Sequence, residues 1–130
     1  MTFLGSNYHP SQPVHILHIH GTADTTVPYA GGSLGTPMFP SNLPPLPGAL
    51  QSVQMWAGYN GCVGQVTEAG RSLDLDLGVP GLDPVVTRYT NNPPGGAVEL
   101  WSAEGVSHSP TLSSEFWPRI IDWLFAHPKP

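Results

Sequence analysis

The sequence has few cationic side chains. Of its 130 residues only four are Lys or Arg, against nine Asp or Glu, and the formal net charge is −5. The basic residues are scattered and form no run. Phosphate backbones and anionic membrane surfaces are bound mainly through clustered Lys and Arg. The charge distribution therefore argues against nucleic acid and membrane surfaces as partners.

Cysteine and long apolar runs are also scarce. Cys62 is the only cysteine, so the chain cannot form an internal disulfide. No apolar stretch approaches the roughly 18 residues that a membrane-spanning helix needs. Residues 1–10 lack the basic start and the apolar run of a secretory signal. We therefore expect a cytoplasmic protein, as the chain is written.

Glycine, proline and aromatic residues are abundant. The chain has 15 Gly and 16 Pro, together with four Trp, four Tyr and four Phe. Disordered chains usually combine high net charge with few aromatic residues, and this sequence has neither property. We expect a single folded domain over residues 1–130, with long Pro- and Gly-rich loops.

The hydrophobic pattern predicts an α/β fold with two main helices. The segment 31–48 carries too many Gly and Pro for a regular element and is predicted to be a loop packed near the site. The stretch 63–83 has mixed signals and receives no assignment. The predicted elements, in order, are a buried strand over 14–20, a helix over 49–60, strands over 85–90 and 97–102 joined by a turn, and a helix over 113–126.

Two polar residues follow the ends of predicted strands. Asp24 comes shortly after the strand over 14–20, and His108 lies in the loop after the strand over 97–102. If these strands are parallel neighbours, their following loops lie at one end of the sheet, where catalytic groups of α/β proteins gather. An Asp can orient a His and stabilise its imidazolium there. The pattern therefore predicts a hydrogen-bonded pair.

Three segments resemble a known family. They are PVHILHIHGTADTTVPYAGG, MWAGYNGC and VELWSAEGVSHSP, and they resemble the second half of α/β-hydrolase esterases of the polyhydroxybutyrate depolymerase and feruloyl esterase group. The resemblance covers roughly residues 13–126 and implies a truncated α/β-hydrolase-like sheet, equivalent to the C-terminal half of that fold. It implies Asp24 as triad acid and His108 as base of a carboxylesterase. Members of this group are often secreted.

The chain departs from the family pattern in two respects. Val106 and Ser107 stand where the family's segment before the histidine carries glycines. The family's nucleophile lies upstream, on a Gly-x-Ser-x-Gly turn between a strand and a helix, and residues 1–23 contain no such motif. The acid and the base are therefore matched, but the serine is not.

The nucleophile remains open at this point. A Gly-x-Ser-x-Gly match occurs at 31–35, with Ser33 as its serine. It follows the acid, no strand is predicted directly before it, and a Pro-rich loop follows it where the family has a helix. Ser107 and Ser109 flank the base closely. The alternatives are Ser33, a serine of a second chain, or a water held by His18, His20 and His108.

A metal-bound water is another possibility. His18 and His20 are two residues apart on a predicted strand, so they share one face. With a carboxylate they could hold zinc, which lowers the pKa of bound water to about 7. The simpler hypothesis is that both are core or supporting histidines and that no cofactor is needed.

Substrate and partner expectations follow from the apolar residues. Tyr29 and Trp101 suggest contact with an uncharged or aromatic acyl group of a small-molecule ester. Without upstream strands, the strand over 14–20 would be a bare apolar edge, which favours pairing. We therefore expect a homo-oligomer that completes the hydrolase. The alternatives are a non-catalytic remnant of a hydrolase and a metal-dependent hydrolase.

Overall fold

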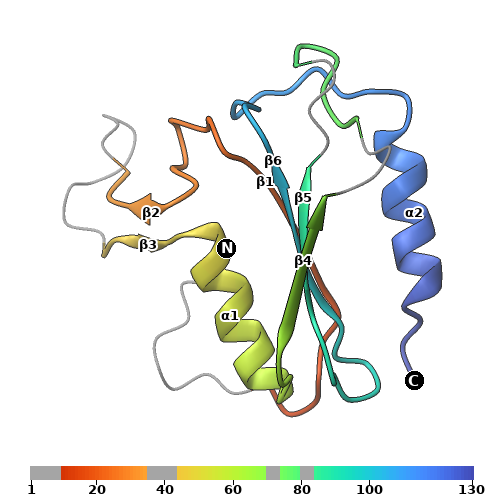
Figure 1. Cartoon of the computed structure of the whole chain (residues 1–130). Coiled ribbons are helices and arrows are strands. Elements are labelled where there is room, and N and C mark those ends of the chain that lie inside the picture. The colour runs from red at the N-terminus through yellow and green to blue at the C-terminus, as the bar shows by residue number, and fades with distance from the viewer. Residues whose placement is uncertain (1–9, 35–43, 70–73, 80–83) are drawn as a thin grey trace.

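The computed structural model describes residues 10–34, 44–69, 74–79 and 84–130. A four-stranded mixed sheet carries one helix on each face, with a small two-stranded sheet beside the first helix (Figure 1). The elements are β1 (Ile16–Gly21), β2 (Gly31–Gly32), β3 (Leu46–Pro47), α1 (Ala49–Asn60), β4 (Gln65–Ala69), β5 (Val85–Tyr89), β6 (Val98–Ala103) and α2 (Phe116–Ala126).

The sheet has the strand order β1-β6-β5-β4. β1 and β6 are parallel, with Ile16 opposite Val98 and Gly21 opposite Ala103. β5 is antiparallel to β6, and β4 is antiparallel to β5. The predicted α/β class and the predicted parallel pair are therefore confirmed. The carboxyl ends of β1 and β6 lie at the same end of the sheet, where the loops that carry Asp24 and His108 begin.

β6 is buried at all six positions because both faces of the sheet are covered. On one face Val98 and Leu100 pack with Val53 of α1. On the other, Trp101 packs with Trp123 of α2. This two-sided burial explains why apolar residues of β6 point to both faces of the sheet.

The two main helices were predicted, with one shift. α1 has the predicted bounds and ends where Gly61 takes a left-handed conformation, with φ of 73°. α2 begins at Phe116, three residues later than the predicted start at 113. Only Trp123 of α2 is buried, and its exposed apolar residues are Trp117, Ile121, Leu124 and Phe125.

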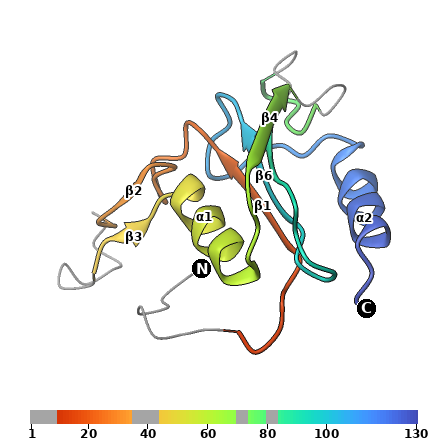
Figure 2. The ribbon, with the colours of Figure 1, turned by 60° about the horizontal axis from the view of Figure 1, so that its bottom comes forward.

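Two features were not predicted. β4 lies within the stretch 63–83 and forms an edge of the sheet, visible beside β5 in Figure 1 and turned forward in Figure 2. The predicted loop over 31–48 contains the short strands β2 and β3, which pair with each other. Its central part, residues 35–43, lies outside the described residues.

Candidate functional site

The loops after β1 and β6 are joined by backbone contacts. Thr22 N–H donates to the Ala103 carbonyl at 2.9 Å, and Ala23 N–H donates to the Val106 carbonyl at 3.1 Å. A Cβ added to Gly21 would lie 2.1 Å from the Val106 oxygen, so the close approach of the two chains requires glycine there. Gly105 N–H also donates to Thr22 Oγ1 at 2.9 Å. These contacts fix the two loops relative to each other.

Asp24 is held at the start of its loop by both carboxylate oxygens. Oδ1 accepts the backbone N–H groups of Thr26 and Val27, each at 2.9 Å. Oδ2 lies 2.8 Å from Nδ1 of His108. Burial alone would raise the pKa of Asp24, but the hydrogen bonds from His108, Val27 and Thr26 outweigh it and hold the pKa below its ordinary value. The carboxylate is therefore ionised when it faces His108.

His108 is the more open partner. Its side chain is 49% exposed, against 6% for that of Asp24. Because a carboxylate only accepts, the ring nitrogen Nδ1 must carry the proton that it shares with Asp24. In the neutral ring Nε2 then holds a lone pair. The predicted hydrogen bond between Asp24 and His108 is present, and it leaves a basic nitrogen available.

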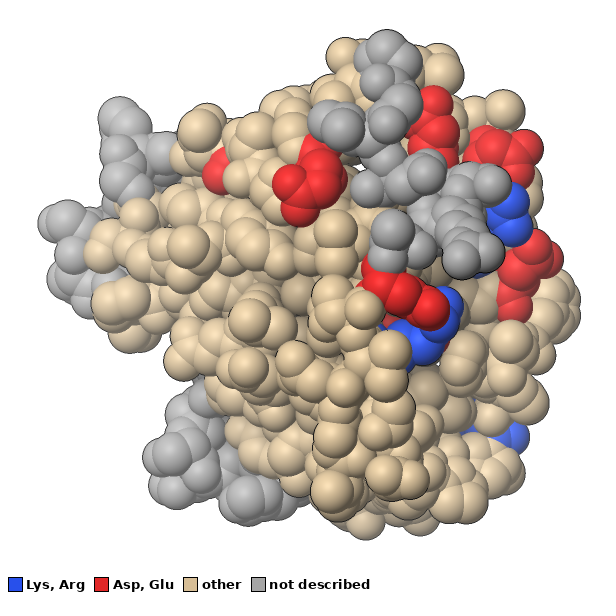
Figure 3. Space-filling view, viewed as in Figure 1, with Lys and Arg blue, Asp and Glu red and all other residues tan. Residues whose placement is uncertain are grey.

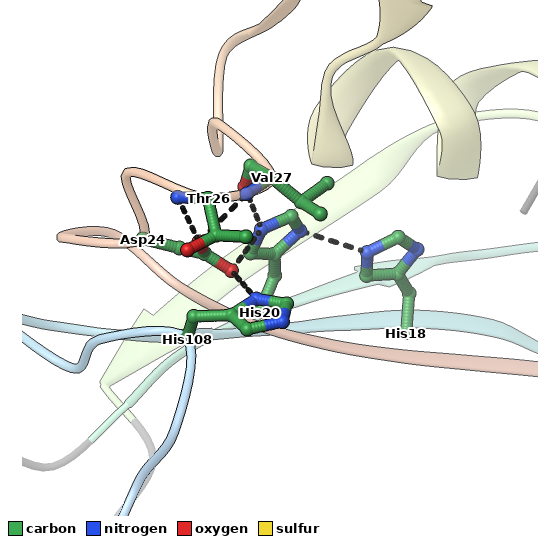
Figure 4. Close-up of polar contacts among 6 residues, drawn as sticks. All are labelled: His18, His20, Asp24, Thr26, Val27 and His108. Atoms are coloured by element: carbon green, nitrogen blue, oxygen red, sulfur yellow. Dashed lines mark hydrogen bonds and ion pairs between the residues drawn. The ribbon is translucent and has the colours of Figure 1, made fainter. Parts of the chain in front are cut away.

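A second histidine supports the same carboxylate (Figure 4). Nε2 of His20 lies 2.9 Å from the Val27 carbonyl oxygen and 3.4 Å from Asp24 Oδ2. Its Nδ1 lies 3.3 Å from Nε2 of His18, and the two ring planes are nearly parallel, at 10°, with 5.5 Å between centroids. A continuous line of polar contacts therefore runs from His108 through Asp24 and His20 to His18.

A cavity of about 480 Å³ opens beside these residues. Its polar side contains Asp24 and the three histidines described above, together with Ser52 and Ser107. Leu34, Leu46 and Pro47 line it as well, so the described ends of the loop over 31–48 pack near the site as predicted. Most of the remaining lining is apolar, contributed by Ile19, Val27, Leu75, Val106, Leu112 and Phe116. The cavity suits an uncharged organic ligand.

The other predicted site residues lie away from this lining. Ser33 is exposed, and it does not line the cavity although Leu34 does. Tyr29 OH contacts Ser102 Oγ at 2.5 Å, between the first loop and β6. Trp101 is 5% exposed and packs in the core on the α2 side, where its indole N–H donates to Glu99. Neither of the two aromatic residues expected to contact a substrate lines the cavity, and Trp101 packs against Trp123 of α2.

Ser52 and Asp76 were missed by sequence reasoning. Ser52 is a buried polar residue of α1 and lines the cavity; a serine inside an apolar helical stripe was the available signal. Asp76 Oδ1 accepts N–H groups from Gly78 at 2.8 Å and Thr111 at 3.0 Å. It thereby anchors the chain just beyond His108. No pattern in the stretch 63–83 indicated it.

The residues proposed for zinc do not fit a metal. His20 Nε2 donates to a carbonyl and its Nδ1 faces His18, so coordination by His20 would break one of these contacts. Among residues 10–34, 44–69, 74–79 and 84–130, no three His, Cys, Asp or Glu side chains are grouped to hold a metal. In the same ranges, no helix is long and apolar enough to cross a membrane.

Comparisons with known proteins add no assignment. The chain matches no protein-family model, and neither a curated protein nor a solved structure matches it.

Proposed function

We propose that the protein is a hydrolase of carboxylic esters in which Asp24 and His108 act as an acid–base pair. The observation that carries the proposal is the 2.8 Å contact between Asp24 Oδ2 and His108 Nδ1 at the edge of a largely apolar cavity. The resemblance of both loop segments to esterases supports the same assignment, with the sheet as the C-terminal half of such a fold.

His108 is the general base of the proposed reaction. Its Nε2 takes a proton from the attacking hydroxyl as the oxygen bonds to the ester carbonyl carbon. Asp24 stabilises the resulting imidazolium and holds the ring in the required tautomer. The tetrahedral intermediate then collapses, the C–O bond to the alcohol breaks, and the imidazolium returns the proton to the leaving alkoxide.

Water is the nucleophile that this geometry favours. The side chain of His108 is half exposed, so water has access to the ring. Ser52 and Ser107 line the cavity but form no hydrogen bond with His108 among the described residues. For a serine to act as the nucleophile, Ser33 or another serine of a second copy would have to approach His108 when two copies associate.

We include self-association in the proposal, with a second copy of this chain as the partner. β1 ends the sheet, and a strand at an edge presents unpaired backbone groups. The exposed apolar residues of α2 recur at helical spacing: Trp117 is 60% and Phe125 82% exposed. Figure 3 shows a broad uncharged area over α1, which contains no charged residue. Exposed apolar surface of this kind is typical of a protein interface. A second copy of the chain presents the same edge strand and the same apolar face of α2.

Turnover of p-nitrophenyl acetate and hexanoate tests the chemistry. Hydrolysis by the purified protein, unaffected by a chelator, supports the proposal. Labelling by a fluorophosphonate, located by mass spectrometry, identifies a serine nucleophile, and absence of labelling in an active protein supports water. No turnover by the oligomer would contradict the proposal and favour a non-catalytic hydrolase remnant.

Sedimentation velocity at micromolar concentration tests the association. We expect a mass of at least twice 13.9 kDa. The variant Phe125→Glu places a charge at the most exposed apolar position of α2 and is expected to lower the mass to that of a monomer. Val63→Glu, at a 68% exposed site outside α2, is the matched control. A wild-type protein that sediments at 13.9 kDa would contradict self-association.

A further inference from the structure

His18 has no role in the proposed reaction, yet it lines the cavity. It lies on the face of β1 that packs toward α1, the helix that also contributes Ser52 to the lining. One of its nitrogens, Nε2, contacts His20. Nδ1 has no hydrogen-bond partner among the described residues. A half-buried imidazole with one free nitrogen in a cavity can bind a ligand.

His20 determines which kind of hydrogen bond that nitrogen can form. Nε2 of His20 faces the Val27 carbonyl at 2.9 Å, and a carbonyl only accepts, so Nε2 carries a proton. In neutral His20 the other nitrogen, Nδ1, then has a lone pair. The contact at 3.3 Å is a hydrogen bond only if His18 Nε2 donates. Neutral His18 consequently has its lone pair on Nδ1.

The surroundings keep His18 neutral. Burial and the neighbouring His20 lower the pKa of His18 from 6.5 to about 4. At neutral pH its free nitrogen therefore accepts a hydrogen bond and does not attract an anion. Among the described residues, no Lys or Arg lines the cavity. The ligand that fits is uncharged and carries a hydroxyl or amide N–H.

We propose that His18 is a specificity-determining residue that accepts a hydrogen bond from a hydroxyl group of the substrate, held in the accepting tautomer by His20. His18 precedes His20 by two residues, about 7 Å along a strand, and lies away from the carboxyl end that carries Asp24. A suitable ester therefore has its hydroxyl several bonds from the scissile carbonyl. The position of that carbonyl rests on the proposed function; the hydrogen bond to His18 does not.

The tautomer is measured directly by long-range ¹H–¹⁵N correlation spectra of the histidine rings at pH 8, where an ordinary imidazole is neutral. We expect His18 to be protonated on Nε2 and unprotonated on Nδ1. Benzyl alcohol should then shift the His18 Nδ1 resonance in a saturable manner, whereas benzyl methyl ether, which lacks the donor, should not. An Nδ1-protonated His18, or equal shifts with both compounds, would overturn the proposal.

Substrate selectivity gives an independent readout. We expect kcat/KM for p-nitrophenyl 6-hydroxyhexanoate to exceed that for p-nitrophenyl hexanoate by about tenfold, the value of one ordinary hydrogen bond. His18→Phe keeps the ring area without an acceptor and should make the two esters equal. His18→Gln restores an acceptor and should recover part of the preference. Equal rates in an active wild-type protein overturn the proposal.

The two proposals fail in distinguishable ways. If neither ester is hydrolysed, the hydrolase assignment fails, and the benzyl alcohol titration still decides the role of His18. If His18→Phe is active on both esters but retains the tenfold preference, the hydrolase assignment stands and the role of His18 is refuted.

Discussion

The two members of the proposed pair are held very differently. The Asp24 side chain is 6% exposed and accepts two backbone N–H groups as well as the contact from His108. The His108 side chain is 49% exposed, and its hydrogen bond to Asp24 is its one polar side-chain contact within the described residues. Asp24 is therefore part of the fold, whereas His108 depends on Asp24 for its orientation.

This difference separates effects on activity from effects on stability. Removing His108 deletes a half-exposed ring, and water can take its place beside Asp24 Oδ2. Changing Asp24 alters an acceptor for two backbone N–H groups as well as the partner of the base. Substitutions at the two positions should thus have similar effects on turnover and different effects on folding.

The largest expected effect is on turnover in His108→Ala. The variant lacks the base, so we expect ester hydrolysis to fall to the uncatalysed rate. The free energy of urea unfolding should stay within about 0.5 kcal/mol of that of the wild type, because the lost side chain is half exposed and water can replace it. Initial rates with p-nitrophenyl acetate and urea titration monitored by Trp fluorescence measure both. A fully active His108→Ala protein would refute the assignment.

Asp24→Asn should reduce turnover nearly as much, by up to about 10⁴-fold, in analogy with triads whose carboxylate becomes an amide. The amide N–H₂ cannot accept from His108 Nδ1–H, so the ring turns or adopts the other tautomer and Nε2 loses its lone pair. Unlike His108→Ala, this variant should also be less stable, by about 1–2 kcal/mol. Single-turnover rates and urea unfolding measure the two effects. Unchanged stability would show that the Asp24 carboxylate does not stabilise its loop.

Much of the fold was predictable from the sequence, because strongly apolar elements leave clear patterns. α1 has its predicted bounds since Gly61 ends it. β4 was missed because it is polar and largely exposed, with cross-strand contacts such as Thr67 to Thr87 in place of an apolar face. Hydrophobic periodicity cannot detect an edge strand of that kind.

The site was predictable where topology alone decides it. Asp24 and His108 meet because parallel strands end on the same side of the sheet. The direction of a side chain in a strand covered on both faces is not encoded by its apolar pattern, which is why Trp101 was placed in the pocket and lies in the core. Asp76 was missed because its role depends on a contact 35 residues away, with Thr111.

Gly21→Ala tests whether the loop junction, as opposed to either side chain, maintains the pair. The added Cβ would meet the Val106 oxygen at 2.1 Å, a distance that forces the two loops apart. We expect a loss of about 3 kcal/mol or more in unfolding free energy, together with reduced turnover. Measurements are urea unfolding and initial rates on the folded fraction.

Gly58→Ala is the matched control for that variant. Gly58 lies within α1, and nothing lies within 4 Å of a Cβ added there. Alanine should stabilise the helix by about 0.5–1 kcal/mol. If Gly21→Ala behaves like Gly58→Ala, the close approach of the loops is not a constraint on the site.

A further expected effect is a pH-dependent change in stability at His18. The pKa of His18 is lowered from 6.5 to about 4 in the folded protein, chiefly by burial. As the pH falls from about 6.5 to about 4, the unfolded chain therefore takes up a proton at His18 that the folded protein does not, and stability decreases. The partial exposure of the ring reduces the full effect, so we expect a contribution of about 1–2 kcal/mol.

The variant His18→Phe isolates this contribution. At pH 7.5 His18 is neutral in both states, so the difference in urea midpoint between the wild type and the variant reports packing alone. At pH 4.5 the wild type should have lost more stability than His18→Phe, because the variant has no imidazole to protonate in the unfolded state. If the difference between the two proteins is the same at both pH values, His18 is not protected from protonation, and its assignment as a neutral acceptor in the cavity would lose its electrostatic basis.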